Sequence, residues 1–316
     1  MLAEHQTATG RREQNGVRPM QHRVLLCADD YGISPGVDRG IEELAGKRRL
    51  SAASALVTFP DWPGTAHRLA DLRGNLAIGL HLNLTLGAPL APMPLLAATG
   101  KLPSIGTLTA KALTRRLTAR SVRAEIQAEF TRQLQRFISH VGAQPDFIDG
   151  HQHIHALPGI RDALLDALSS VEWHTRPLVR SPADSFRNIT RRATATRKAL
   201  LLSALSSGFR ARLAAANWPT NNTFAGVSGF AAASPYAAEL EAAFLQPGPL
   251  HLIMCHPGYA DDVLRARDPI VARREQELVA ISTAHDLPRR IWHPEPDAQR
   301  PPVDWTSPRQ WMPDEH

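Results

Sequence analysis

The sequence has little cysteine, few aromatic residues and no long apolar run, and each shortage excludes a class of protein. Only two cysteines occur in 316 residues, Cys27 and Cys255, and both lie within apolar runs. We therefore predict buried free thiols without a disulfide framework, which fits a reducing cytoplasm. No stretch approaches the roughly 18 uninterrupted apolar residues of a membrane span. Aromatic residues make up 6% of the chain, and no zinc finger or nucleotide-binding loop occurs, so we expect no nucleic acid partner.

Lysine is also scarce, whereas arginine is concentrated in one part of the chain. The net charge is +6 over the whole sequence. Between Arg176 and Arg212, eight arginines and Lys198 are balanced by a single acidic residue, Asp184. We interpret this segment as a solvated basic helix. Because Ala199–Leu202 gives it an apolar side, an anionic partner or a lipid headgroup surface is kept open as the alternative.

Composition divides the chain into one domain and two terminal segments. Residues 1–21 are polar and contain no apolar signal-peptide region, so we predict a disordered N-terminal extension, with Met20 as a second candidate start. Residues 22–292 have the composition of a single globular domain. Residues 293–316 are rich in proline and acidic side chains, and we predict a loose C-terminal tail.

Apolar runs alternate with amphipathic segments through the predicted domain. The predicted strands are Arg23–Ala28, Ala53–Thr58, Ala77–Leu84, Pro145–Asp149, Pro177–Arg180 and Leu250–Cys255. The predicted helices are Pro35–Gly46, Pro63–Leu72, Ser121–Val141, Gly159–Leu168, Asp184–Ala216, Ala237–Phe244 and Val271–Ala284. Such alternation implies βα units and a mainly parallel sheet. The sequence therefore predicts an α/β fold, a distorted (β/α) barrel, with Leu86–Arg120 as a loop over its site.

Polar side chains gather where four of these apolar runs end. Asp29 and Asp30 end the first run, His81 lies in the third, and His256 follows the last. The remaining cluster is Asp149-Gly150-His151-Gln152-His153-Ile154-His155. Sites in parallel α/β folds assemble at the carboxyl ends of the strands, so we expect the clusters to converge.

Alternation within the clusters predicts polar faces. In an extended backbone, every second residue lies on the same face, which here groups Asp149, His151, His153 and His155. By the same alternation, His81 shares a face with Asn83. A polar face on an apolar strand is hard to explain by packing, and histidines so placed are candidate metal ligands.

Two adjacent carboxylates at the end of a buried strand repel each other unless a cation lies beside them. A divalent metal supplies that cation, with one aspartate as its ligand and the other free. A carboxylate and two imidazoles leave open coordination positions, as hydrolytic Zn²⁺, Mn²⁺, Co²⁺ or Fe²⁺ sites require. The metal then lowers the pKa of bound water and polarises a carbonyl group. Asp29 is the candidate general base and His256 the candidate general acid.

The same clusters resemble the motifs of the YdjC-type (ChbG/HpnK) carbohydrate deacetylases. The matching segments are Ala28-Asp29-Asp30-Tyr31-Gly32, Gly79-Leu80-His81-Leu82, Asp149–His155 and Cys255-His256-Pro257-Gly258, in order between about Arg23 and about Leu278. The resemblance implies a β/α barrel of the glycoside hydrolase/deacetylase type. It also implies a hydrolase that removes acetyl groups from N-acetylated sugars by attack of metal-bound water. One divalent ion is implied: Mg²⁺, Zn²⁺, Mn²⁺ or Co²⁺.

Carried over by motif, Asp30, His81 and His151 would be the metal ligands, Asp29 the base and His256 the acid. Five further residues would contact the substrate or orient the ligands: Asp149, His153, His155, Asn83 and Arg180. The family includes a chito-oligosaccharide branch and a lipid-associated branch, so a lipid-linked saccharide is kept open as the substrate, and a homodimer as the assembly.

Three other functions are weighed against this one. His151-Gln152-His153 has the His-x-His spacing of binuclear amidohydrolases, which commonly bridge their metals with a modified lysine. None of the chain's four lysines lies at a predicted strand end. A non-catalytic metal- or sugar-binding protein would not need Asp29 and His256 beyond three ligands. No Gly-x-Ser-x-Gly segment occurs, which disfavours a serine hydrolase.

Overall fold

Seven parallel strands form a single curled sheet in the computed structural model, which describes residues 23–229, 234–297 and 299–306. The strands are β1 (Arg23–Tyr31), β2 (Ala52–Ala55), β3 (Ala77–Leu82), β4 (Phe147–Gly150), β5 (Leu178–Val179), β6 (Thr223–Ala225) and β7 (Leu250–Cys255). Their order is β5-β4-β3-β2-β1-β7-β6. Within the described ranges β5 and β6 pair only with β4 and β7, so the sheet is a half-barrel that stays open. The predicted α/β class and distorted barrel are confirmed.

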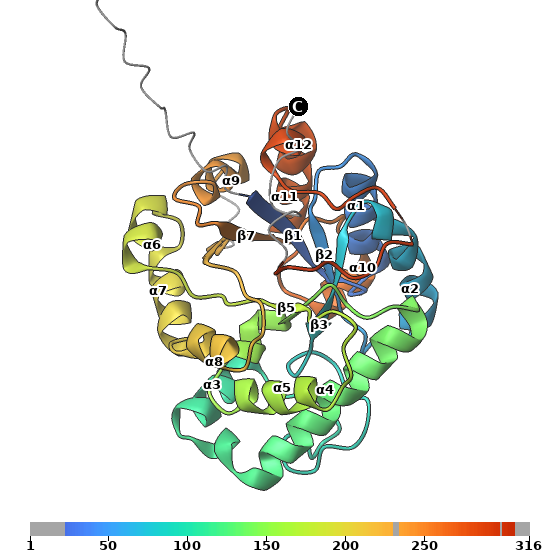
Figure 1. Cartoon of the computed structure of the whole chain (residues 1–316), viewed down its shortest axis with the longest axis vertical. Coiled ribbons are helices and arrows are strands. Elements are labelled where there is room, and N and C mark those ends of the chain that lie inside the picture. The colour runs from blue at the N-terminus through green and yellow to red at the C-terminus, as the bar shows by residue number, and fades with distance from the viewer. Residues whose placement is uncertain (1–22, 230–233, 298, 307–316) are drawn as a thin grey trace, which may run out of the picture.

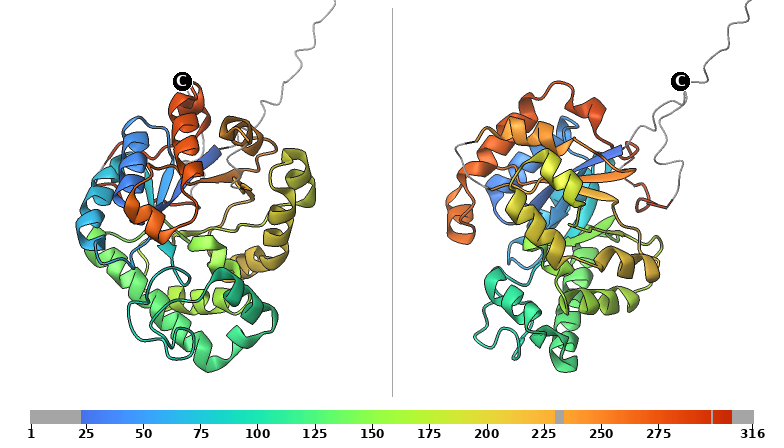
Figure 2. Two further views of the ribbon diagram at one scale, coloured as in Figure 1. Left: turned by 180° about the vertical axis from the view of Figure 1, so that it is seen from behind. Right: turned by 90° about the vertical axis from the view of Figure 1, so that its left-hand side faces the viewer.

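Helices surround the sheet, with the strands at the centre of the molecule (Figures 1 and 2). The longer helices are α1 (Pro35–Gly46), α2 (Trp62–Asp71), α3 (Ile105–Leu113), α4 (Arg120–Val141), α5 (Ile160–Ser169), α7 (Thr196–Leu205), α9 (Tyr236–Ala243) and α11 (Ala272–Thr283). The shorter ones are α6 (Phe186–Arg192), α8 (Phe209–Ala215), α10 (Asp262–Arg267) and α12 (Leu287–Arg290), with 3₁₀ turns η1 (Leu72–Gly74), η2 (Arg116–Thr118) and η3 (His151–Ala156). None of the helices in the described part of the chain could cross a bilayer.

Local sequence explains where the best-predicted helices begin and end. Ser34 caps α1 by accepting a hydrogen bond from the Val37 amide, and Pro35 occupies the first turn. Helix α4 buries its apolar stripe against the sheet and stops at Gly142, whose φ of 75° suits a residue without a side chain. These helices carry enough local information for the sequence to predict them closely.

The two faces of the sheet bury different sets of residues. On β1, Val24, Leu26 and Ala28 belong to the large core between the sheet and the outer helices. Leu25 and Cys27 alternate with them and face the inside of the half-barrel. The inner core is smaller, and it contains Phe147, Leu252, Trp292, Val303 and Trp305. The inner face is therefore packed with apolar residues at the amino ends of the strands, and polar residues can occupy the carboxyl ends.

Several sequence predictions need correction. Strand β4 ends at Gly150, and the histidine cluster forms the 3₁₀ segment η3 instead of extended chain, because Gln152 and His153 adopt left-handed φ values of 53° and 60°. The insert Leu86–Arg120 contains α3 and η2 as well as loop, and Asp184–Ala216 contains three helices instead of one. The short strand β6 was not predicted, because three residues are too few for a periodic pattern.

The chain after Trp292 also packs more closely than a loose tail. Arg300 is 8% exposed and pairs with buried Asp146 at 2.8 Å, and Trp305 donates a hydrogen bond from its indole to the Asp146 carbonyl at 2.6 Å. Val303 lies in the inner core. The prediction of a loose tail is wrong for these residues. The predicted N-terminal extension, residues 1–21, lies outside the described residues.

Candidate metal centre and active site

The predicted site residues meet at the carboxyl ends of the central strands, on the inner face. Asp29, His81, Asp149 and His256 continue the inner-facing alternation of β1, β3, β4 and β7. Asp30 joins them because β1 contains a bulge, in which the pairing with β2 gains one extra residue between Ala28 and Tyr31. At this bulge Asp30 adopts a left-handed φ of 70°. Both adjacent aspartates can therefore line the same cavity.

Asp30, His81 and His151 form a compact buried group. Oδ1 of Asp30 lies 2.8 Å from Nδ1 of His151 and 3.3 Å from Nε2 of His81. All three ligand atoms lie within 4.8 Å of one another, and the three residues are at most 7% exposed. One carboxylate oxygen and two imidazole nitrogens directed at one point suit a divalent transition metal and leave positions for water and substrate.

The protonation of this group is set by burial and by its neighbours. Burial opposes ionisation of Asp30, but the adjacent His151 and the Arg274 guanidinium hold the pKa of its carboxyl well below the usual range. Burial also disfavours protonated His81, whereas the carboxylates of Asp149 and Asp29 raise the pKa of this imidazole to about 10.

Asp149 and Arg180 form a second layer of contacts behind the metal group. Oδ1 of Asp149 lies 2.6 Å from Nδ1 of His81 and accepts a hydrogen bond from the Ser54 hydroxyl, which leaves Nε2 of His81 directed at Asp30. Arg180 contacts Asp149 at 2.5 Å and donates to both oxygens of Asp29, at 2.6 and 2.7 Å. These contacts fix the ring orientation of His81 and the carboxylate plane of Asp29.

A cavity of about 320 Å³ opens directly above these groups. Asp29, Asp30, His81 and His151 lie at its polar end, and His256 lines it from the end of β7. Burial lowers the pKa of His256 to about 4, so its imidazole is neutral near pH 7. The other wall is aliphatic, formed by Ile105, Leu157, Leu201, Leu202, Leu205, Val227, Met254 and Ile270.

The remaining predicted site residues have different positions. His153 lines the cavity and packs its ring edge-on against Phe224. His155 is fully buried, with Nε2 2.8 Å from the Arg180 carbonyl, and it does not line the cavity. Asn83 also lies away from the cavity, where its side-chain oxygen accepts hydrogen bonds from the amides of Thr85 and Leu86. The common face predicted for the histidine cluster is therefore wrong, because η3 turns successive side chains in different directions.

Three residues at the site were missed by sequence analysis: Ser54, Asp268 and Arg274. Arg274 and Asp268 line the cavity, and Arg274 donates to Asp30 at 2.6 Å. Ser54 is a small hydroxyl residue within the alanine-rich strand β2, and Arg274 is one of two adjacent arginines in α11. No local pattern distinguishes Ser54 and Arg274, since their partners Asp149 and Asp30 lie 95 and 244 residues away along the chain. Asp268 reaches the site through its pairing with Arg274.

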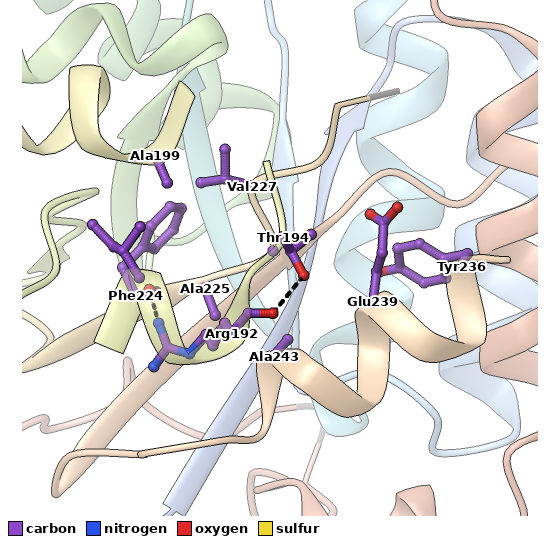
Figure 3. Close-up of a pocket in the computed structure, with 11 residues that line it drawn as sticks. Arg192, Thr194, Ala199, Phe224, Ala225, Val227, Tyr236, Glu239 and Ala243 are labelled. Carbon is purple, nitrogen blue, oxygen red and sulfur yellow. Dashed lines mark hydrogen bonds between the residues drawn. The ribbon is translucent and has the colours of Figure 1, made fainter. Parts of the chain in front are cut away.

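A second, much smaller cavity lies behind β6, between α6, α7 and α9 (Figure 3). Its volume of about 30 Å³ has room for one or two water molecules. Arg192 closes one side by donating to the Phe224 carbonyl at 2.8 Å and pairing with Asp184 at 2.7 Å. This cavity is too small for a metabolite, so the larger cavity is the candidate active site.

Comparison with known proteins decides the family. The sequence model of YdjC-like proteins matches residues 23–286, which include all four polar clusters. The chain belongs to the YdjC-like family. A carbohydrate deacetylase of Halalkalibacterium halodurans is 26% identical to this YdjC-like chain over 272 residues, 84% of the chain and 98% of that protein. A chitooligosaccharide deacetylase of Proteus mirabilis is 35% identical over 136 residues, 43% of the chain.

The matches differ in how far they extend. In the Proteus mirabilis protein, as in a chitooligosaccharide deacetylase of Enterobacter sp., the matched region spans about half of the relative's length, 51% and 53%. The YdjC-like chain also shares its fold with a crystal structure from Enterococcus faecalis V583, described as a cellobiose-phosphate cleavage protein. That match has a TM-score of 0.63 at 21% identity and covers 87% of this chain and 98% of the other.

Proposed function

We propose that this YdjC-like chain is a divalent-metal-dependent hydrolase that removes acetyl groups from N-acetylated sugars. The observation that carries the proposal is the pairing of a three-ligand group, Asp30, His81 and His151, with a separate carboxylate, Asp29, in one cavity. Metal binding alone needs only the three ligands, whereas hydrolysis also needs a group that accepts the proton of the attacking water. The names of its relatives, chitooligosaccharide and carbohydrate deacetylases, support the same chemistry.

Each residue has a distinct role in this proposal. Asp30, His81 and His151 would hold the ion, which when bound would activate a water molecule and polarise the acetamide carbonyl. Asp29, oriented by Arg180, would accept the proton that the attacking water loses. His256 directly follows β7, lines the same cavity and would pass a proton to the leaving nitrogen. Because its imidazole is neutral near pH 7, the half-buried His256 would take that proton from solvent water as it passes one to the nitrogen.

A binuclear site is the weaker alternative. The described residues do contain a second group of potential ligands, Cys27, Asp29 and Asp149. Arg180 already lies among them, 3.0 Å from the Cys27 sulfur and within 2.7 Å of both carboxylates. A guanidinium supplies the positive charge that a second metal ion would otherwise provide, so we propose one metal ion, with Zn²⁺, Mn²⁺, Co²⁺ and Mg²⁺ as candidates.

The aliphatic wall supports a substrate whose sugar carries a lipid. Helix α7 directs Leu201, Leu202 and Leu205 at the cavity, and Leu201 is 60% exposed at its mouth. These side chains cannot satisfy the hydroxyl groups of successive sugar rings, whereas an alkyl chain would bury apolar area against them. Lys198, on the same helix, adds a cation for an anionic linkage. We propose a lipid-linked N-acetylated sugar in preference to a chito-oligosaccharide, acted on in the cytoplasm by a monomer or homodimer.

Acetate release from a panel of N-acetylated compounds tests the reaction and the substrate together. The panel contains methyl and octyl N-acetylglucosaminides and diacetylchitobiose, each with protein reconstituted with Zn²⁺, Mn²⁺, Co²⁺ or Mg²⁺. Acetate from the octyl glycoside at a higher kcat/KM than from the methyl glycoside or chitobiose is expected. Equal kcat/KM values for the three compounds would reject the preference for a lipid-linked substrate but not the deacetylase activity. No acetate from any compound would reject the deacetylase activity itself.

A matched pair of variants tests whether the aliphatic wall causes the preference for the octyl glycoside. Leu201→Gln should reduce the advantage of the octyl over the methyl glycoside, because Leu201 lines the cavity. Leu113→Gln replaces a leucine of similar exposure, 67%, on α3, outside the cavity lining, and should leave that advantage unchanged.

A further inference from the structure

Arg274 connects the candidate metal centre to two other parts of the chain. It lies in the first turn of α11 and is 0% exposed. Its Nη2 donates to Oδ2 of Asp30 at 2.6 Å and to Oδ2 of Asp268 at 2.7 Å, and its Nε donates to the Ile270 carbonyl at 3.0 Å. Its own carbonyl accepts a hydrogen bond from the Gly258 amide, two residues after His256. Three acceptors thus fix one buried guanidinium.

The two carboxylate oxygens of Asp30 are divided between different partners. Oδ1 is directed at the imidazoles, 2.8 Å from His151 and 3.3 Å from His81. Oδ2 is held by Arg274. A carboxylate whose second oxygen is held in this way offers a metal ion one oxygen instead of two, so more coordination positions stay open for water and substrate.

Asp30 is a residue whose position needs such support. Its φ of 70° belongs to the left-handed region, which costs a residue with a side chain about 1 kcal/mol or more. It lies in a bulge, where regular strand pairing does not hold it. Asp268 anchors Arg274 from the other side, and its own Oδ1 accepts the Ile270 amide at 2.7 Å. The guanidinium therefore cannot turn away from Asp30 without losing several hydrogen bonds.

We infer that Arg274 is a positioning residue of the metal centre, which holds Asp30 as a one-oxygen ligand. The inference rests on the proposed metal-dependent function, and it assigns a role to a residue outside the four polar clusters of the sequence analysis. Without the guanidinium, Asp30 is free to rotate or to use both oxygens, and the ligand set loses its preformed geometry.

The test compares neighbouring arginines by Mn²⁺ titration calorimetry on the full-length protein. Arg274→Gln should bind Mn²⁺ about 10–100-fold more weakly than the wild type, the usual effect of losing a partner of a metal ligand. Arg273→Gln is the matched control, because Arg273 is also buried, at 2% exposure, but pairs with Glu239 at 2.5 Å. It should bind Mn²⁺ as the wild type does. Arg274→Lys keeps the charge without the planar fork and should recover part of the affinity.

Each result decides the inference. Wild-type affinity in Arg274→Gln, or an equal loss in Arg273→Gln, would overturn it. If circular dichroism shows that Arg274→Gln does not fold, Asp268→Asn replaces it, since this change removes one anchor and keeps the guanidinium. Unchanged Mn²⁺ affinity in Asp268→Asn would then overturn the inference. No Mn²⁺ binding by the wild type would reject the metal centre and the inference together, whereas normal binding without acetate release would reject only the proposed reaction.

Discussion

His81 and Asp149 face each other across neighbouring strands, with Nδ1 of the imidazole 2.6 Å from the carboxylate. The two residues are paired in the register of β3 and β4, so the sheet itself sets this contact. The carboxylate fixes the ring so that its other nitrogen, Nε2, is directed at Asp30. A carboxylate behind a histidine ligand commonly fixes both the tautomer and the orientation of the ring.

Replacing Asp149 should therefore weaken metal binding without removing a ligand. We expect Asp149→Asn to reduce Zn²⁺ affinity by about 10–100-fold, because the ring of His81 loses its anionic partner. Titration with a chromophoric chelator measures the affinity. Asp162→Asn, at a half-buried carboxylate that pairs with Arg212 on the outer surface, is the control. Equal affinity in the Asp149 variant and the control would contradict the orienting role.

Two histidines of η3 should respond differently to the same change. His151→Ala should lose metal and activity together, because Nδ1 of His151 lies beside Asp30. His153→Ala should keep stoichiometric metal, since its ring packs on Phe224 and is not part of the ligand group. Metal content by plasma mass spectrometry separates the two. Metal loss in the His153 variant alone would show that the ligand set has been misassigned.

Removing the general base should abolish nearly all turnover without affecting metal binding. Asp29→Asn is expected to retain the metal and to lose about 100-fold or more in kcat, the usual range for removing a general base. Metal content and acetate release are measured on the same preparation. Wild-type turnover in this variant would mean that another group takes the proton.

Stability should depend on pH through His251, which lies away from the site. Burial lowers its pKa to about 4, while Nε2 lies 2.9 Å from the Ala243 carbonyl. Between about pH 6.5 and about pH 4 the unfolded chain binds a proton that the folded chain does not, so the free energy of unfolding falls as the pH falls. This residue alone should account for on the order of 3 kcal/mol.

Urea unfolding between pH 4 and 7 checks this sign. His251→Gln should be less stable at pH 7 but should show a flatter pH dependence than the wild type. His67→Gln, at an exposed histidine, should keep the wild-type slope. A His251 variant with the full wild-type slope would assign the effect to other buried histidines.

The packed residues near the C-terminus should contribute to stability. Arg300→Ala should cost about 3–5 kcal/mol, because it leaves Asp146 buried without its 2.8 Å partner. Arg290→Ala breaks an exposed pair with Glu241 and should cost about 0–1 kcal/mol. Chemical denaturation compares them. Equal, small costs would mean that the segment around Arg300 adds little to the folded state.

The sequence by itself determined the features that depend on neighbours along the chain. Apolar runs and amphipathic spacing predicted most strands and the helix α4, since burial of one face imposes a period on the residues. Four predicted strands end in polar residues. Because parallel strands have their carboxyl ends at the same edge of the sheet, this pattern predicted where the site lies. Residue type and position indicated a metal site with one aspartate and histidines as ligands, and the resemblance to the YdjC-type motifs then named Asp30, His81 and His151.

Only the tertiary structure decided how those residues are oriented and what supports them. The left-handed turn at Gln152 and His153 directs His151 away from His153 and His155, although the three histidines are equivalent in the sequence pattern. Arg180 could be named from the sequence as a site residue, but its pairing with Asp29, 151 residues away, is set by the fold. Arg274 lies 244 residues from Asp30, and no local sequence pattern predicts its role. Contacts over such separations depend on how the strands are ordered in the sheet, and that order is a property of the whole packed chain.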